Sequence, residues 1–302
     1  MRNLIIGSIF LSLAGSIWGA MFIAVRCSIF VIPPLPLVWL RYAAALVALT
    51  ALMLYKKESW YIAPKDRKLL FFSALIGQTI SIVTQETGTM LTSAQTGSVI
   101  TAATPAFMVV FGCLLLKEKI TLGRVLSVVL ATIGVLFIVF DPDNVELNSA
   151  WGGISLVVAA ITWALMSVLL KFLAKYSVVT LTFYGVLIAF IILMPYGLYW
   201  LFNFADLSAM SEPKIIGAVL YLGFISTTAG FCLWNKGLTY MDAAIGGLFM
   251  FFQPVVGSFL GWWLLGEPVT KYFWIGFLLI ALGVVLAMRG GNTTAKEKLA
   301  RK

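Results

Sequence analysis

Two charged residues stand inside apolar stretches, where a charge must be paired or hydrated. Arg41 falls in the stretch 35–54, and Glu86 falls near the end of the stretch 69–90. A charge at this depth in a bilayer is costly unless it finds a partner. Because Glu86 is the acid best placed to reach Arg41, we expect an ion pair, or an Arg41 that attracts an anionic ligand. The alternative is an Arg41 that reaches lipid headgroups or backbone carbonyls of the turn 33–36.

Neutral polar and aromatic residues fall near the middle of the apolar stretches when depth is counted at about 1.5 Å per residue. Amides, hydroxyls and flat aromatic faces suit a ligand with an apolar or aromatic body and a polar end. For the aromatic residues, simple packing against lipid or helices is the alternative. The candidate binding residues are Trp18, Gln78, Thr101, Trp163, Tyr221 and Gln253.

Two prolines interrupt apolar stretches at the same depth. Pro105 frees the carbonyl of Thr101 from helical hydrogen bonding, and Pro254 does the same for Met250. Free carbonyls are tolerated at membrane depth only against protein partners or a wet cavity. We therefore expect both prolines to be gating positions that line a cavity, with a static packing kink as the alternative.

The elements that must position these residues are membrane helices. Hydrophobic residues make up 61% of the 302 residues and charged residues 11%, and the mean hydropathy is +1.02. A bilayer core of about 30 Å needs roughly 20 apolar residues per helix. The sequence predicts an all-α integral membrane protein with ten transmembrane helices, approximately 4–26, 35–54, 69–90, 92–116, 121–140, 151–173, 177–200, 214–236, 240–265 and 271–288.

The basic residues are distributed unevenly between the two ends of these helices. With the N-terminus inside, 17 of the 21 lysines and arginines fall in inner segments. This is the positive-inside pattern, so the net charge of +9 orients the chain and does not indicate nucleic acid as a partner. We expect a multi-pass protein with both termini cytoplasmic and the lipid bilayer as its surroundings.

The second half of the chain repeats the first with a constant offset of 149 residues, giving twelve identities over 48 positions without a gap. Composition alone does not explain the match, because proline, glutamate and threonine positions also agree. Such duplication commonly builds two halves around a central site. The first-half residues are Gly88, Ala94, Gly97, Pro105, Gly112, Leu115, Leu116, Glu118, Thr121, Leu130, Gly134 and Val135.

Five helices per repeat is an odd number, so the second copy must enter the membrane in the opposite orientation. The loop after the fourth helix carries Lys117 and Lys119, whereas its counterpart 266–268 has no lysine. We therefore predict two inverted-topology five-helix repeats. The expected boundaries are 1–140 for the first repeat, 141–150 for an outer linker, 151–288 for the second repeat and 289–302 for a basic cytoplasmic tail.

These motifs resemble a known family over essentially the whole chain. Trp18-Gly19, Arg41, Pro105, Glu118 and Gly134 are similar to one EamA-type repeat, and Trp163-Ala164, Pro254, Glu267 and Gly283 are similar to a second. The chain thus resembles the ten-helix EamA-type members of the drug/metabolite transporter superfamily. The resemblance implies small-solute transport across the bacterial inner membrane, commonly export of amino acids, metabolites or drugs.

The expected function is therefore transport of small metabolites by alternating access, with the substrate bound between the halves. Export of amino acids or related amphipathic or aromatic metabolites or drugs is favoured. The alternatives are import or exchange of nucleoside- or nucleotide-type metabolites, and a polytopic membrane enzyme. Proton coupling would use Glu86 because the chain has no histidine; facilitated diffusion or exchange is the other possibility.

The sequence offers few residues of the types that catalysis or metal binding usually requires. The chain has no histidine, and its cysteines at 27, 113 and 232 show no CxxC spacing. We expect no enzyme activity, no cofactor and no metal, a small-molecule substrate, and a monomer or homodimer.

Two further pairs are expected to be structural. Glu118 and Glu267 each precede a threonine at a helix start, where negative charge meets the helix dipole. Gly15-x-x-x-Gly19 and Gly257-x-x-x-Gly261 place small residues on one helix face, for packing inside the bundle or at a dimer interface.

Overall fold

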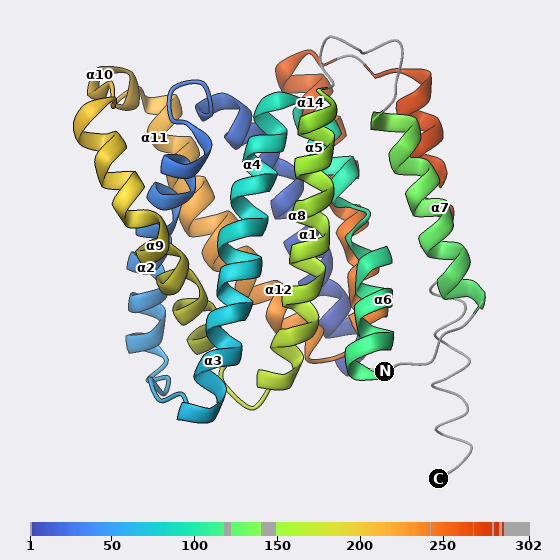
Figure 1. Cartoon of the computed structure of the whole chain (residues 1–302), viewed down its shortest axis with the longest axis horizontal. Coiled ribbons are helices and arrows are strands. Elements are labelled where there is room, and N and C mark those ends of the chain that lie inside the picture. Colours follow the sequence, from blue (N-terminus) through green and yellow to red (C-terminus); the bar gives the residue numbers. More distant parts are fainter. Residues whose placement is uncertain are drawn as a thin grey trace.

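The computed structural model is a bundle of helices whose axes run roughly side by side (Figure 1). It describes residues 2–117, 122–139, 149–241, 243–267, 269–279, 281–283 and 286, and these residues contain helices and turns but no strand. The helices are α1 (Arg2–Ser28), α2 (Pro34–Tyr55), α3 (Pro64–Ser73), η1 (Ala74–Ser81), α4 (Ile82–Leu91), α5 (Ala94–Thr101), α6 (Thr104–Leu116), α7 (Leu122–Val139), α8 (Ala150–Leu170), η3 (Lys171–Leu173), α9 (Val178–Asn203), α10 (Leu207–Met210), α11 (Pro213–Leu220), η4 (Tyr221–Ala229), α12 (Gly230–Leu238), α13 (Ala243–Gly247), η5 (Leu248–Phe251) and α14 (Phe252–Leu265).

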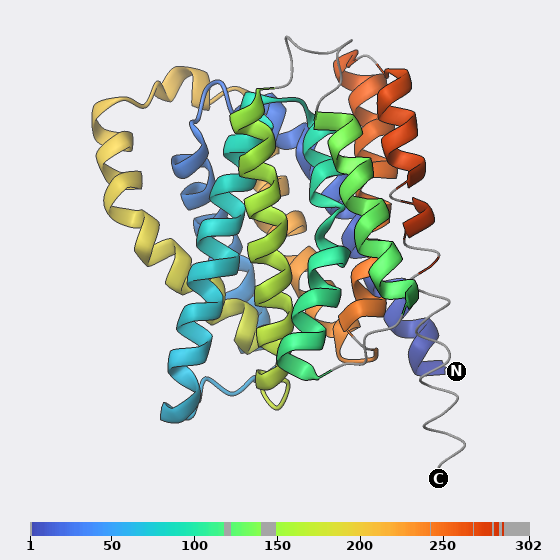
Figure 2. The same cartoon turned by 45° about the vertical axis from the view of Figure 1, so that its right-hand side comes forward.

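Seven of the described helical segments are long and apolar enough to cross a membrane, and each has about half of its residues buried inside the bundle. They are Ile5–Ser28, Pro34–Tyr55, Pro64–Leu91, Ala94–Leu116, Ala150–Leu173, Val178–Asn203 and Pro213–Leu238. The 18-residue helix α7 and the shorter apolar helices Phe249–Leu265 and Lys271–Gly283 stand beside them (Figure 2). The fold class is therefore the expected all-α integral membrane protein, and the count of ten crossings stays a prediction.

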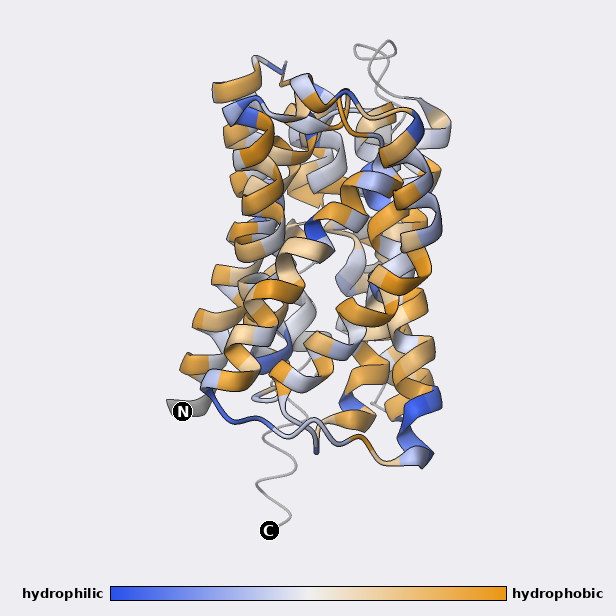
Figure 3. Ribbon diagram, turned by 90° about the vertical axis from the view of Figure 1, so that its left-hand side faces the viewer, coloured by the Kyte–Doolittle hydropathy of each residue, from blue (hydrophilic) through white to orange (hydrophobic). Residues whose placement is uncertain are grey.

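Most residues along the length of the helices are hydrophobic, and hydrophilic residues are more frequent toward the two ends of the bundle (Figure 3). At one end, lower in Figure 1, lie the turn between α2 and α3, the turn between α8 and α9, and the end of α12. We call this the basic end. Among the described residues it carries Lys56, Lys57, Lys65, Arg67, Lys68, Lys171, Lys175 and Lys236.

Each half of the chain contains a π-helical segment inside one of its long helices. The segment η1 interrupts α3–α4, and η4 interrupts α11–α12. Shifting η1 by the repeat offset places it at 223–230, almost on η4. In η4 the hydroxyls of Thr227 and Thr228 donate to the carbonyls five residues earlier, Leu222 and Gly223, at 2.7 and 3.1 Å. The wider turn redirects side chains toward the centre of the bundle, as π-bulges at functional sites commonly do.

The helix α1 runs through the centre of the bundle and makes close contact with α14. A Cβ atom at Gly19 would lie 2.6 Å from the carbonyl oxygen of Gln253 and 3.0 Å from the amide nitrogen of Gly257. A Cβ at Gly15 would lie 2.6 Å from the carbonyl oxygen of Phe249. The small residues therefore serve packing between the two halves inside the bundle, the first of the two roles expected for them.

Replacement of Gly19 by leucine is expected to destabilise the protein strongly. The larger side chain meets backbone atoms that cannot rotate away, and overpacking of this kind costs about 1–3 kcal/mol or more. The measurement is the thermal unfolding midpoint of the purified protein in detergent. Gly217→Leu is the matched control, because a Cβ at Gly217 meets nothing within 4 Å. Equal midpoints for the two variants would contradict the close contact between α1 and α14.

Candidate functional site

Arg41 on α2 is fully buried and ties four helical segments together. Its Nη1 donates to Glu86 Oε1 on α4 at 2.6 Å, and neither side chain is exposed. Its Nε donates to Thr227 Oγ1 and its Nη2 to Ser226 Oγ, both on η4 and both at 3.0 Å. Nη2 also lies 3.4 Å from Met21 Sδ on α1. The expected ion pair is present, and the alternative in which Arg41 reaches lipid headgroups or the 33–36 turn is wrong.

The ion pair joins the two halves of the chain through one guanidinium. Arg41 and Glu86 belong to the first half, and the two hydroxyls that complete the coordination belong to the second. The planar guanidinium presents several donors in fixed directions, so it can hold three partners at once. Glu86 Oε2 is buried and has no hydrogen-bond partner in the described structure. One carboxylate oxygen is therefore left to accept a hydrogen bond from a ligand or a water.

Four aromatic side chains from three helices form a cluster beside this network. The ring of Trp18 lies 5.2 Å from that of Trp163, 5.9 Å from Phe231 and 5.3 Å from Trp234. Trp163 and Phe231 are 5.2 Å apart. Two of the indoles are held by hydrogen bonds, from Trp18 Nε1 to the carbonyl of Ser226 at 3.0 Å and from Trp234 Nε1 to Ser167 Oγ at 3.2 Å. Trp18 and Trp163, predicted to bind substrate, thus pack against each other and against α12, and their role in binding stays a prediction.

A small cavity of about 10 Å³ lies between the aromatic cluster and α14, with room for about one water molecule. Gln253 Nε2 donates to Thr101 Oγ1 at 3.2 Å, which joins two of the predicted residues directly. Gln253 Oε1 and Trp163 Nε1 are buried and make no hydrogen bond to any part of the chain that is described. The lining residues are Trp18, Met21, Ile82, Gln85, Trp163, Phe231, Met250 and Gln253.

Other predicted residues lie near this cavity but do not line it. Gln78 is buried against α9, where a Cβ on Gly185 would lie 3.4 Å from its Cγ, and its backbone carbonyl accepts from Tyr42 Oη at 2.5 Å. Tyr221 is half-buried and donates from Oη to the carbonyl of Ile17 at 2.8 Å. Pro254 lines a separate apolar groove of about 550 Å³ with α14 and the helix that follows.

Both prolines stand at a break in their helix. The break between α5 and α6 directly precedes Pro105, and the carbonyl of Thr101 accepts from Thr104 Oγ1 at 2.6 Å. In the second half, the 3₁₀ turn η5 leads into α14 just before Pro254. The carbonyl expected to be free at Thr101 is therefore satisfied by a neighbouring hydroxyl.

Sequence reasoning missed five residues of the site: Met21, Gln85, Phe231, Ser226 and Met250. Met21 falls seven residues before the loop and reads as an ordinary apolar helix residue. Ser226 reaches Arg41 only because η4 is π-helical, and the repeat contains no residue pattern that signals this turn. The one available signal was its neighbour Thr227, which stands near the middle of the apolar stretch 214–236 and so near mid-membrane at about 1.5 Å per residue.

Glu267 closes the end of the bundle opposite the basic end. Its carboxylate oxygens accept from the backbone amides of Ala94 and Gln95, both at 2.9 Å, at the first turn of α5. Gln95 Nε2 donates back to the Glu267 carbonyl at 3.1 Å. Glu267 has the expected structural role, but the helix that it caps is α5 of the other half. Thr270 caps the helix after Glu267, because its Oγ1 accepts from Phe273 N at 3.1 Å. Glu118 lies outside the described residues.

An apolar helical bundle with seven described segments long enough to cross a bilayer defines a polytopic membrane protein, and aromatic and amide groups line its small central cavity. The sequence profile of the EamA-like transporter family matches the chain twice, over residues 5–140 and 150–289. The chain therefore belongs to this family of membrane transporters.

Individual relatives agree with this assignment. An "Uncharacterized transporter" of Archaeoglobus fulgidus is 27% identical over 284 residues, covering 93% of this chain and 98% of the relative. The "Uncharacterized transporter YoaV" of Bacillus subtilis is 26% identical over 275 residues, covering 89% and 92%. One crystal structure superposes with a TM-score of 0.70 at 18% identity, over 95% of this chain and 98% of that one, which shows a shared fold.

Proposed function

We propose that this transporter exports amino acids or related amphipathic or aromatic metabolites across the bacterial inner membrane by alternating access. The observation that supports this most is the central cavity, where Trp163 Nε1 and Gln253 Oε1 lack partners among the described groups. Buried polar atoms are rarely left unpaired, so a donor and an acceptor facing one cavity favour a ligand that supplies both.

An amino acid with an apolar or aromatic side chain carries hydrogen-bond donors and acceptors that complement the unpaired polar atoms of this cavity. Its ammonium group can donate to Gln253 Oε1, its carboxylate can accept from Trp163 Nε1, and its side chain can lie against the aromatic cluster. The cavity in this state holds about one water. Binding therefore requires the two halves to separate at the cavity.

The two halves, residues 1–140 and 151–288 in inverted orientation, are the bodies that we propose move. The Arg41 network holds them together beside the central cavity, and the Glu267 cap does so at the end opposite the basic end. At the basic end, which we place in the cytoplasm with both termini, a cavity of about 590 Å³ opens between α1, α9 and α12. The hydrogen bond from Trp234 to Ser167 joins the aromatic cluster of the central cavity to the smaller pocket that adjoins this opening. The state is therefore closed outside and open only part of the way from inside.

The experiment is counterflow in proteoliposomes that contain the purified protein and a panel of aromatic and aliphatic amino acids. Saturable counterflow of at least one amino acid supports the proposal. Counterflow of nucleosides without amino acids would replace the substrate class, and absence of any counterflow with a folded protein would contradict transport of either class.

Removal of the Trp163 indole N–H is expected to weaken substrate binding. Trp163→Phe keeps a ring in the cluster but loses the donor, and a lost hydrogen bond to a charged group costs about 1.5–3 kcal/mol, a rise in KM of at least tenfold. The matched control is Trp39→Phe, because Trp39 Nε1 is also buried and unpartnered in the described structure but stacks on Phe190 at 5.7 Å, away from the cavity. Equal KM values for the two variants would contradict the assigned role of Trp163.

A further inference from the structure

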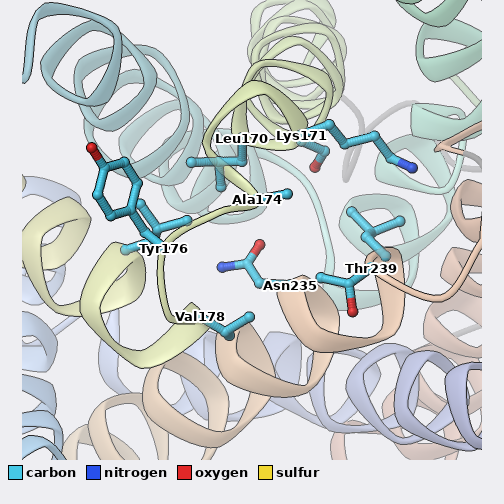
Figure 4. A pocket seen from close by; sticks show the side chains of 10 residues that line it. Leu170, Lys171, Ala174, Tyr176, Val178, Asn235 and Thr239 are labelled. Atoms are coloured by element: carbon cyan, nitrogen blue, oxygen red, sulfur yellow. The ribbon is translucent and has the colours of Figure 1, made fainter. Parts of the chain in front are cut away.

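The opening at the basic end is built from both halves of the chain. Its volume is about 590 Å³, and its lining includes Lys56 and Glu58 after α2, Tyr176 before α9, and Cys232, Lys236 and Tyr240 on and after α12. We call this opening the vestibule. It adjoins the smaller pocket of Figure 4, with which it shares Ala174, Tyr176, Val178 and Thr239.

Positive charge converges on the vestibule from separate elements. Lys56 and Lys236 are both exposed on its wall, where Glu58 is the one acid. Two other lysines of the basic end do not line the vestibule and are engaged elsewhere: Lys171 donates from Nζ to the carbonyl of Met241 at 2.7 Å, and Lys175 pairs with Asp66 at 2.7 Å. The positive-inside pattern explains why lysines occur at this end of the protein. It does not explain why lysines from opposite halves line the same opening.

The vestibule lies next to the central cavity in the fold. Consecutive residues of α12 line the two spaces, since Phe231 faces the central cavity and Cys232 and Leu233 face the vestibule. Cys232 and Lys56 line the same opening, so the thiol lies in the space that the two lysines border. A solute drawn into the vestibule therefore stands one helix wall away from the aromatic cluster.

We propose that the vestibule recruits small solutes through their carboxylate groups, with Lys56 and Lys236 holding carboxylate-bearing substrates at the inner mouth before the central cavity opens. This inference rests on the proposed function and deepens it, because it names the substrate carboxylate as the group that the protein selects first. In a water-filled opening, a single ammonium group about 5–10 Å from an anion raises the local concentration of that anion by roughly two- to threefold at moderate salt.

Cys232 provides a native reporter of the field inside the vestibule. In a background with Cys27→Ala and Cys113→Ala, it is the one remaining cysteine. Its thiolate attacks a methanethiosulfonate reagent, a mixed disulfide forms, and methanesulfinate leaves. The measured quantity is the rate with an anionic sulfonatoethyl reagent divided by the rate with a cationic trimethylammonium-ethyl reagent. Each rate is first divided by the rate of that reagent with a small free thiol.

The proposal predicts a normalised ratio above one that falls roughly two- to fivefold in Lys56→Gln and again in Lys236→Gln. Lys65→Gln is the matched control, because Lys65 is an exposed lysine of the same end outside the vestibule lining. An unchanged ratio in the two vestibule variants overturns the proposal, and so does a Cys232 that reacts with neither reagent. The normalised ratio is also measured in nanodiscs of anionic and of zwitterionic lipid. A ratio that falls to one in anionic lipid alone shows that the lysines bind lipid headgroups, and this result also overturns the proposal.

A transport arm separates this inference from the proposed function. Recruitment predicts that the double variant Lys56→Gln/Lys236→Gln raises KM for phenylalanine at unchanged kcat, and lowers KM for phenylalaninamide, which keeps its positive charge but lacks the carboxylate. A charge-dependent ratio at Cys232 without any amino-acid transport rejects the proposed function and keeps the anion-recruiting vestibule. Transport with no effect of either lysine on the ratio or on KM rejects the vestibule and keeps the proposed function.

Discussion

Replacement of Arg41 by alanine is expected to lower the transport rate at least 100-fold and to destabilise the protein. The substitution leaves Glu86 buried without its cation, and breaking one side of a buried pair costs about 3–5 kcal/mol. It also removes the donor that joins Ser226 and Thr227 to the first half. The measurements are counterflow in proteoliposomes and the unfolding midpoint in detergent.

Two further variants separate transport from stability at this pair. Arg41→Lys keeps the charge but loses the fork of donors, so it is expected to retain the fold and lose most transport. The double variant Arg41→Met/Glu86→Leu removes both charges at similar volume, and is expected to recover much of the stability without recovering transport. Wild-type rates in both Arg41→Ala and Arg41→Lys would contradict a role for Arg41 in transport.

The exposed ion pair at the basic end is the control for these variants. Lys175 Nζ lies 2.7 Å from Asp66 Oδ2, and the Lys175 side chain is 51% exposed. The hydrogen bond that Lys175 donates to Asp66 raises the pKa of Lys175 and lowers the pKa of Asp66. The pair is therefore complete at neutral pH, and it is lost as the pH rises through the pKa of Lys175 or falls through the pKa of Asp66. We expect Lys175→Gln to leave the transport rate unchanged across the neutral range, from about pH 6 to about pH 8.

Replacement of Glu267 by alanine is expected to release the start of α5. The carboxylate accepts from the amides of Ala94 and Gln95, and a charged group at a helix N-terminus with two such bonds stabilises by about 2–3 kcal/mol. The direct measurement is hydrogen–deuterium exchange at those two amides, which is expected to accelerate at least tenfold. Because this contact joins the two halves, we also expect the closed state to lose population.

A second carboxylate cap at the same end provides the control. Asp206 Oδ1 accepts from the amides of Ser208 at 2.9 Å and Ala209 at 3.1 Å, all within the exposed short helix α10. Asp206→Ala is expected to accelerate exchange in α10 alone and to leave transport unchanged. Slow exchange at Ala94 and Gln95 in Glu267→Ala would show that this cap does not hold the two halves together.

The sequence was sufficient where one strong energetic rule decided the outcome. Arg41 and Glu86 were expected to pair because an isolated charge at that depth is costly, and they do pair at 2.6 Å. Thr101 and Gln253 were both expected at the centre from depth alone, and they share a hydrogen bond. The all-helical membrane fold follows in the same way from hydropathy and helix length.

The sequence was insufficient where local geometry or long-range contact decided the outcome. The π-helical turn η4 brings Ser226 to Arg41, and no sequence period distinguishes it from an α-helix. The position of Gln78 against α9 depends on how a helix rotates about its axis, which shifts by about 100° per residue. Glu267 caps α5, 172 and 173 residues away, and no local pattern names that helix.

The account depends on a central cavity that opens to each end of the bundle in turn, and Met250 lies on its wall. The test is a Met250→Cys variant without native cysteines in proteoliposomes of known orientation, labelled from each side with a membrane-impermeant thiol reagent. We predict labelling from both sides, slowed by a transported substrate at saturation. Labelling from neither side by a protein that still transports would contradict the central cavity as the binding site.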